Sequence, residues 1–195
     1  MKQSYLELIK SIAELDPPLF VFGGIAEDAL LDSKLSRPHG DIDIMVLRAE
    51  LSQRKEQCEQ LGFSNLEVYY EPIGGRPLVL GGQEGGLNLE LGVCDRYGDA
   101  HYFSVIDEDG DLCRIYAPDD IFAHAATVIE GTQIHTVSPL ALYQIRAGLG
   151  ITKSFGPPRS RDLAAQRRLR TNLLADHAEA ALRPRIEKLS SAEQQ

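Results

Sequence analysis

The sequence lacks the features that define several large classes of protein. Its 195 residues contain only three cysteines, which are scattered and have no C-x-x-C spacing. This argues against a disulfide framework or a zinc site and favours the reducing cytosol. No run of about 18 apolar residues is present, so no membrane span is expected. The N-terminus lacks the apolar stretch of a secretory signal. We therefore predict a cytoplasmic protein with no membrane partner.

Basic charge is also scarce over most of the chain. The net charge is −9, and residues 1–150 hold 24 acidic and 11 basic side chains, whereas residues 151–195 hold 5 acidic and 9 basic ones. The acidic part would repel nucleic-acid phosphates, so a nucleic-acid partner is disfavoured. It suits a cationic small molecule instead. The sequence leaves a homodimer open.

What is present is the pattern of a mixed α/β protein. Apolar residues make up 43% of the chain, which is enough for one sizeable core. Periodicity and capping signals predict helices over 3–15, 25–35, 50–61, 138–150, 161–174 and 179–189. Apolar or alternating runs predict strands over 19–23, 41–47, 66–70, 87–93, 101–105, 112–116 and 131–137. The glycine-rich segment 74–86 is predicted as turns or a mobile loop, and residues 190–195 as a frayed end.

The most informative segment runs from Gly23 to Ile44. A Gly-Gly pair opens a short helical run, and Asp41 and Asp43 follow with one residue between them. In a strand, alternate residues point the same way, so these two carboxylates project together. They repel each other unless a cation lies between them, and hard oxygen ligands favour Mg²⁺. Paired glycines let backbone N–H groups approach a phosphate at a helix N-terminus. The segment predicts metal-assisted transfer of a phosphate-bearing group.

The same residues carry a family resemblance. Gly23, Gly24, Ala26 and Asp28, followed by the run 37–43 (RPHGDID), resemble the signature of the DNA-polymerase-β-like nucleotidyltransferase superfamily. The likeness is strongest to the small lincosamide and aminoglycoside adenylyltransferases. The alternative is a β-turn before an edge strand whose aspartates are solvated.

The resemblance implies an α/β fold in which helices flank a small mixed sheet. It assigns residues 1–137 to a nucleotidyltransferase domain and residues 138–195 to a short helical C-terminal segment. The implied activity moves AMP from ATP, or another nucleoside monophosphate, onto a hydroxyl of a small molecule such as an aminoglycoside or lincosamide. Two other functions stay open: modification of a protein partner in a toxin–antitoxin pair, and nucleotide or partner binding without catalysis.

The resemblance also implies a set of metal ligands. Asp41 and Asp43 would hold Mg²⁺ or Mn²⁺, and a third carboxylate on a later strand would complete the site or act as general base. Glu90 is our candidate because it lies on the polar face of the strand 87–93. In another register Asn88 takes that position, and catalysis would be weak or absent because an amide is not a base. Asp95 and Asp99 are weaker candidates.

Nucleotide-binding residues are expected among glycines and cations. Gly23 and Gly24 would cradle the triphosphate, and the candidate cations are Arg37, Arg146, Lys153 and Arg161. Ser138-Pro139, Arg146 and Arg161-Asp162 resemble a family pattern, although Arg146 stands where lysine is common and the usual second acidic residue is absent. The alternative role of the last three cations is a surface salt-bridge network.

Two further groups of residues have predicted positions near the motif. His39 is expected to be structural and hydrogen-bonded to the backbone, and Asp28 to support the glycine turn. Tyr69, Tyr70 and Glu71, together with the segment 74–86, would form either an acceptor pocket or a plain surface excursion.

Overall fold

The structure is a computed structural model that describes residues 4–72, 74–154 and 156–189. The predicted frayed end, 190–195, lies outside these residues. The helices are α1 (Tyr5–Ala13), α2 (Gly23–Leu31), α3 (Leu51–Gln60), α4 (Pro139–Thr152), α5 (Ser160–Asn172) and α6 (Glu179–Leu182), with a 3-10 turn η1 (Arg48–Glu50). The strands are β1 (Phe20–Phe22), β2 (Ile42–Leu47), β3 (Glu67–Tyr70), β4 (Pro77–Glu84), β5 (Leu87–Tyr97), β6 (Ala100–Ile106), β7 (Leu112–Ala117), β8 (Thr127–Ile129), β9 (Thr132–Thr136) and β10 (Arg185–Lys188).

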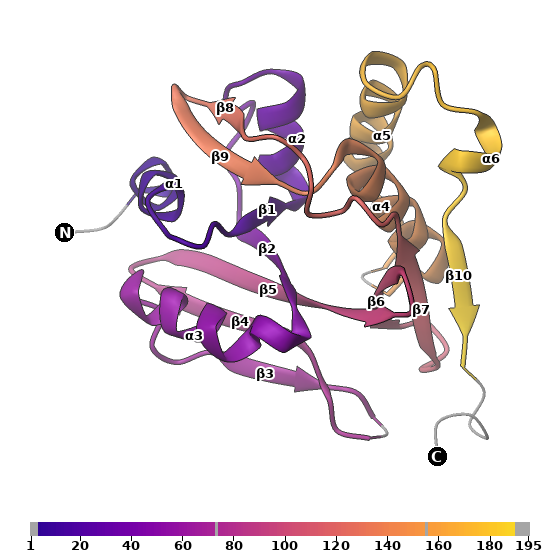
Figure 1. The fold of residues 1–195 in the computed structure, drawn as a ribbon, viewed down its shortest axis with the longest axis horizontal. Helices are drawn as coiled ribbons and strands as arrows, with labels where there is room; N and C mark the ends of the chain where they lie inside the picture. Colours follow the sequence, from indigo (N-terminus) through magenta and orange to yellow (C-terminus); the bar gives the residue numbers. More distant parts are fainter. Residues whose placement is uncertain (1–3, 73, 155, 190–195) are drawn as a thin grey trace.

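The strands of the described residues form one mixed sheet, in the order β10-β7-β6-β5-β2-β1-β9-β8 (Figure 1). The pairs β2–β5 and β1–β9 are parallel. The long strand β5 pairs with β2 and β4 over its first part and with β6 at its end, and β3 pairs with β4. This arrangement confirms the predicted α/β class, a mixed sheet flanked by helices.

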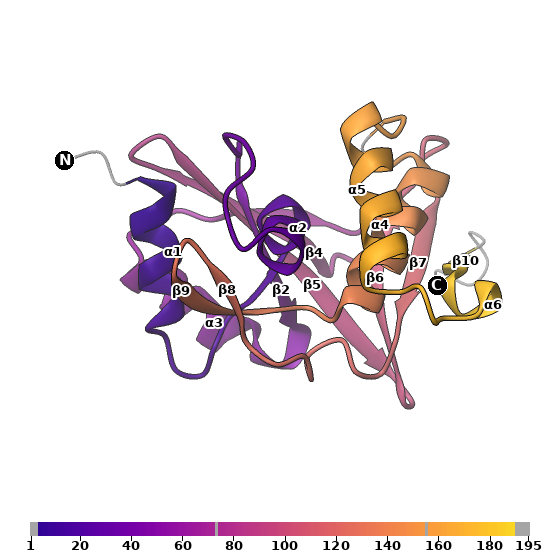
Figure 2. The ribbon, with the colours of Figure 1, turned by 90° about the horizontal axis from the view of Figure 1, so that it is seen from above.

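The helices lie around the sheet in separate groups. α4 contacts β7 and α5, and α5 also contacts α2, while α1 contacts β9 and α3 contacts β2. Figures 1 and 2 show α4 and α5 side by side, far from α1. The predicted cap of α4 is present, because Ser138 accepts a hydrogen bond from the Ala141 N–H and Pro139 is the first helical residue.

Within the described residues no helix combines the length and apolarity needed to cross a bilayer.

Alternation along the central strands separates a buried face of the sheet from a polar one. Ile42 and Ile44 of β2 are fully buried beside Leu89 and Leu91 of β5. Because successive side chains of a strand point to opposite faces, Asp43 projects from the other face. The hydrophobic core therefore fixes the direction of the motif carboxylate.

The glycine-rich segment 74–86 is not a loop, and that expectation was wrong. Most of it is strand β4, which pairs with β3 and β5. Glycine was interpreted as a chain breaker, but here it permits close packing: a Cβ at Gly82 would lie 2.7 Å from the Leu66 side chain. Pairing on both sides offsets the cost of glycine in a strand.

The predicted helix over 179–189 was also wrong. Helix α6 ends at Leu182, and Arg183 is extended, with φ −70° and ψ 126°. Pro184 explains the stop, because proline disfavours the helical conformation of the residue before it. The chain then forms β10, which pairs with β7.

Candidate active site

A cavity of about 610 Å³ lies between the polar face of β2 and β5, the start of α2 and the α4–α5 connection. This volume is within the range of about 300–1,000 Å³ usual for small-molecule sites. Asp41, Asp43 and Glu90 line its sheet side. Its other side is lined by four arginines. Arg37 comes from the motif loop, which joins α2 to β2, Arg146 from α4, and Arg159 and Arg161 from the start of α5. The cavity thus has an acidic wall and a basic wall.

The three carboxylates come together through strand pairing. Asp43 of β2 lies directly beside Glu90 of β5, and Asp41 immediately precedes β2. Burial, followed by the charges of Asp41 and Glu90, raises the pKa of Asp43 to about 8. Burial and the Asp41 charge also raise the pKa of Glu90. This mutual repulsion is the condition that a bound cation relieves.

The donor set fits a hard divalent cation. Carboxylate oxygens are the ligands that Mg²⁺ and Mn²⁺ prefer, and the set consists of Asp41, Asp43 and Glu90. Among the described residues, no three acidic, histidine or cysteine side chains are already gathered closely enough to hold an ion. Their chemistry fits the metal, and these carboxylates would have to draw together around it.

Asn88 has a different position from Glu90. Its Nδ2 donates a hydrogen bond to the Gly40 carbonyl at 2.7 Å, so its amide holds the residue that precedes Asp41. Glu90, not Asn88, lies at the cavity. The register of β5 therefore keeps a carboxylate beside Asp43.

Asp28 fastens the motif loop to helix α2. Its carboxylate accepts hydrogen bonds from the Ser36 N–H and hydroxyl, each at 2.7 Å, and lies 2.8 Å from His39 Nε2. The expected backbone partner of His39 is thus replaced by a side chain. These contacts hold the loop that carries Arg37 and Asp41 against the helix that begins at the Gly-Gly pair.

The two motif glycines leave room for functional side chains. Gly23 has φ +66°, and a Cβ there would lie 1.8 Å from Asp43 Oδ2. A Cβ at Gly24 would lie 2.7 Å from Nη2 of Arg37. Close packing of Asp43 and Arg37 against the start of α2 therefore requires glycine.

We expect Gly23→Ala to lower the free energy of unfolding by about 2 kcal/mol or more, since it combines a positive φ with a clash against Asp43. Gly40→Ala is the matched control, because nothing lies within 4 Å of its Cβ position; its effect should stay within about 0.5 kcal/mol. Urea unfolding measures both variants. Equal stability of the two would contradict this account of Gly23.

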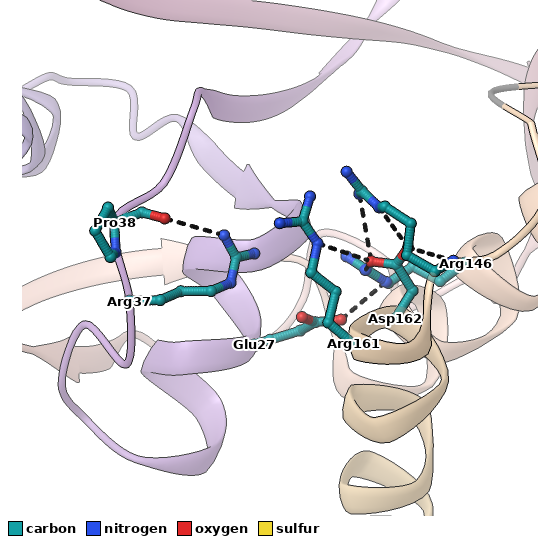
Figure 3. Close-up of polar contacts among 7 residues, drawn as sticks. Glu27, Arg37, Pro38, Arg146, Arg161 and Asp162 are labelled. Atoms are coloured by element: carbon teal, nitrogen blue, oxygen red, sulfur yellow. Dashed lines mark hydrogen bonds and ion pairs between the residues drawn. The ribbon is translucent and has the colours of Figure 1, made fainter.

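Arg146 is the centre of the basic wall. Its Nε lies 2.8 Å from Glu27 Oε1, and its Nη2 donates to Asp162 Oδ1 at 2.8 Å. Figure 3 shows Arg146 with its two acidic partners, Glu27 of α2 and Asp162 of α5. Arg159 donates to Asp162 Oδ2 through Nε at 2.8 Å, and Arg161 Nε is 4.0 Å from Oδ1. Three guanidinium groups therefore lie within 4.0 Å of the Asp162 carboxylate. Arg146 of α4 connects α2 and α5 through its ion pairs with Glu27 and Asp162.

Arg37 completes this wall from the motif loop. Its Nη1 donates to the Pro38 carbonyl at 3.2 Å (Figure 3). The structure does not place Lys153 at the cavity: its Nζ lies 2.6 Å from Glu108 Oε1 in the turn between β6 and β7. Lys153 ends α4 in the left-handed conformation, with φ 52°. Of the predicted cations, Arg37, Arg146 and Arg161 meet at the cavity and Lys153 does not.

Two residues of this site were missed in the sequence. Glu27 follows Gly24 by three residues, and this helical spacing places both on one side of α2. Arg159 precedes Asp162 by three residues, the spacing of a capping box, and the structure shows that box. Both spacings are visible in the sequence, but neither residue belongs to the motif that directed attention there.

Glu27 should make stability depend on pH. Burial raises its pKa to about 7 from 4.5, so between these values the folded protein holds a proton that the unfolded chain releases. Stability is then lost as the pH rises through this window. Between pH 5 and 7, we expect wild type to lose on the order of 2 kcal/mol more than Glu27→Gln.

Urea unfolding in a chelator at several pH values measures the loss. Glu56→Gln, an exposed glutamate of α3, is the control and should follow wild type. Parallel curves for wild type and Glu27→Gln would refute the role of Glu27.

Comparison with known proteins establishes the fold class. No family model matches the sequence, and no curated protein is significantly similar to it. The crystal structure of ANT(2'')-Ia in complex with adenylyl-2''-tobramycin matches with a TM-score of 0.65 and 21% identity, over 91% of this chain and 92% of that chain. The solution structure of the antibiotic-resistance factor ANT(2'')-Ia matches with a TM-score of 0.65 and 23% identity, over 93% and 91%. The chain therefore shares the fold of ANT(2'')-Ia, a mixed sheet flanked by helices.

Proposed function

We propose that this protein is a nucleotidyltransferase that moves AMP from ATP onto a hydroxyl of an aminoglycoside. The observation that carries the proposal is the separation of charge across one cavity. Asp41, Asp43 and Glu90 form the acidic wall, and the basic wall holds four arginines. A triphosphate and a metal site need these two kinds of surface side by side. The matching structure of ANT(2'')-Ia contains adenylyl-2''-tobramycin, which supports the choice of nucleotide and acceptor.

The basic wall would hold the triphosphate. Arg159 and Arg161 are at least half exposed, with 64% and 50% of their side-chain surface accessible. Their guanidinium groups can turn from Asp162 toward phosphate oxygens, which arginine can bind through two parallel hydrogen bonds. The first N–H groups of α2, at Gly23 and Gly24, would add backbone donors. Arg146 remains held by its two carboxylates and braces the wall.

The acidic wall would hold the metal and the acceptor. Bound Mg²⁺ or Mn²⁺ supplies positive charge at the α-phosphate and the leaving pyrophosphate. Glu90 is exposed at the cavity and lies directly beside Asp43, a position that suits a general base. The acceptor oxygen attacks the α-phosphorus, its proton passes to Glu90, and the bond between the α-phosphorus and the bridging oxygen breaks to release pyrophosphate. Glu90 at the cavity favours this activity over binding without catalysis.

The test is pyrophosphate release from ATP and Mg²⁺ across aminoglycosides, lincosamides and simple polyols. The Asp41→Ala/Asp43→Ala protein is the blank. We expect release with aminoglycosides and none from the blank. Release with lincosamides alone would correct the acceptor. Silence across the panel, with ATP still bound, would overturn small-molecule transfer and favour a protein acceptor.

A further inference from the structure

The acidic wall of the cavity continues across the sheet to the edge strand β3. Strand pairing places two rows of residues on the same face, since directly paired residues project together. The first row, from β2 to β3, is Asp43, Glu90, Gly81 and Glu67. The second row is Met45, Gly92, Val79 and Tyr69. The members from β2 and β5, and Val79, line the cavity, so Glu67 and Tyr69 extend its floor.

Tyr69 presents an uncovered aromatic ring at the end of this floor. Its Cε2 lies 3.9 Å from the Cβ position of Gly81, which confirms that the ring lies on the cavity face. The residue is 59% exposed. Gly81 contributes no side chain between the ring and Glu90, whereas Phe103 and Met45 pack over Gly92. An exposed aromatic beside a glycine surface is a common stacking platform for a ring-shaped ligand.

The charges of the two rows indicate the charge of a ligand that would bind there. Glu67, Glu90 and Asp43 are acidic, and none of the eight residues is basic. Glu67 is exposed and has no basic partner among the ion pairs of the described residues. The neighbouring Glu71, by contrast, is buried and bound by Arg76 at 2.9 Å. Anionic groups are thus directed to the arginine wall and cationic groups to the β3 side.

We propose that Glu67, Tyr69, Val79 and Gly81 form an acceptor strip that binds a cationic amino sugar. A sugar ring packs against Tyr69, an ammonium group lies near Glu67 and the Tyr69 ring face, and the reacting hydroxyl points back to Glu90. The reaction of that hydroxyl with ATP rests on the proposed function. Binding to the strip needs only the surface described above.

The pair Tyr69→Ala and Tyr97→Ala tests the strip. Both tyrosines are exposed, at 59% and 70%, but Tyr97 lies at the end of β5 that pairs with β6 and not with β4. With tobramycin as acceptor, Tyr69→Ala should raise KM about three- to tenfold and leave kcat and the KM for ATP within about twofold. Tyr97→Ala should behave as wild type. Equal KM values for the two variants would overturn the strip.

A second pair tests the charge. Glu67→Gln should raise the KM for tobramycin about threefold or more and weaken its dependence on salt. Glu84→Gln removes the same charge from the opposite face of β4 and should change neither. If Glu84→Gln raised KM as much as Glu67→Gln, the general acidity of the protein, not the strip, would attract the acceptor.

Calorimetric binding of tobramycin without nucleotide separates this proposal from the activity. Binding that weakens in Tyr69→Ala but not in Tyr97→Ala supports the strip even if no pyrophosphate forms, in which case only the proposed transfer fails. If Tyr69→Ala and Glu67→Gln turn over tobramycin as wild type does, the proposed transferase activity is supported and the strip is overturned. No binding and no turnover overturns both.

Discussion

Replacing Asp43 by asparagine should reduce pyrophosphate release by at least about 10³-fold while the protein stays folded. The substitution removes the charge that is proposed to hold the metal but keeps the size of the side chain. Stability should be maintained or improved, because burial and two neighbouring carboxylates already disfavour the ionised form of Asp43. The measurement combines turnover at saturating ATP and tobramycin with urea unfolding of the same preparation.

Asp99→Asn is the control for Asp43→Asn. Asp99 is fully exposed and pairs only loosely with Arg96, at 4.0 Å, so its variant should keep wild-type activity and stability. An Asp43→Asn protein that retains more than about a tenth of wild-type activity would refute the metal-binding role, since loss of a required charge costs far more. Loss of activity together with loss of structure would point to a structural role instead.

Removing Arg146 should produce the largest loss of stability in the site. Its side chain is only 14% exposed and is held between Glu27 and Asp162. Arg146→Ala leaves two carboxylates in a poorly solvated place without their shared cation. Breaking a buried ion pair from one side typically costs about 3–5 kcal/mol. Urea unfolding at pH 8, where the Glu27 pKa of about 7 leaves this group ionised, should show the full effect.

Arg161→Ala distinguishes bracing from phosphate binding. Arg161 is half exposed and lies 4.0 Å from Asp162, so its loss should change stability by no more than about 1 kcal/mol. It should weaken ATP binding instead. If Arg146→Ala were as stable as wild type and only its ATP affinity fell, Arg146 would be a phosphate ligand and not the brace between α2, α4 and α5.

The acidic half of the site could be predicted because its geometry is local. Asp41 and Asp43 belong to one short motif, and Glu90 follows from the alternation of one strand. Strand periodicity fixes which face each side chain takes, and the apolar residues of the same strands identify the buried face. What the sequence could not decide was the choice between Asn88 and Glu90, because that depends on how β5 pairs with β2.

The basic half could be predicted only in part, because its geometry is tertiary. Arg146, Arg159 and Arg161 meet through the packing of α4 on α5, and no local spacing encodes that contact. Lys153 has the same charge and a nearby position in the chain, yet the left-handed end of α4 accompanies its pairing with Glu108. The same holds for two strands. The glycines of β4 predicted a loop and the residues of β10 predicted a helix, but both segments form strands because neighbouring strands pair with them.

The peripheral position of β3 and β4 has an evolutionary consequence. Among the residues that the structure describes, these strands pair with the rest of the sheet through β5 alone, whereas Asp43 and Glu90 lie on the paired central strands β2 and β5. If the proposed function holds, sequence changes in β3 and β4 can alter the surface proposed to meet an acceptor without displacing Asp43 and Glu90. Such a chain can acquire new acceptors through small changes at one edge of its sheet.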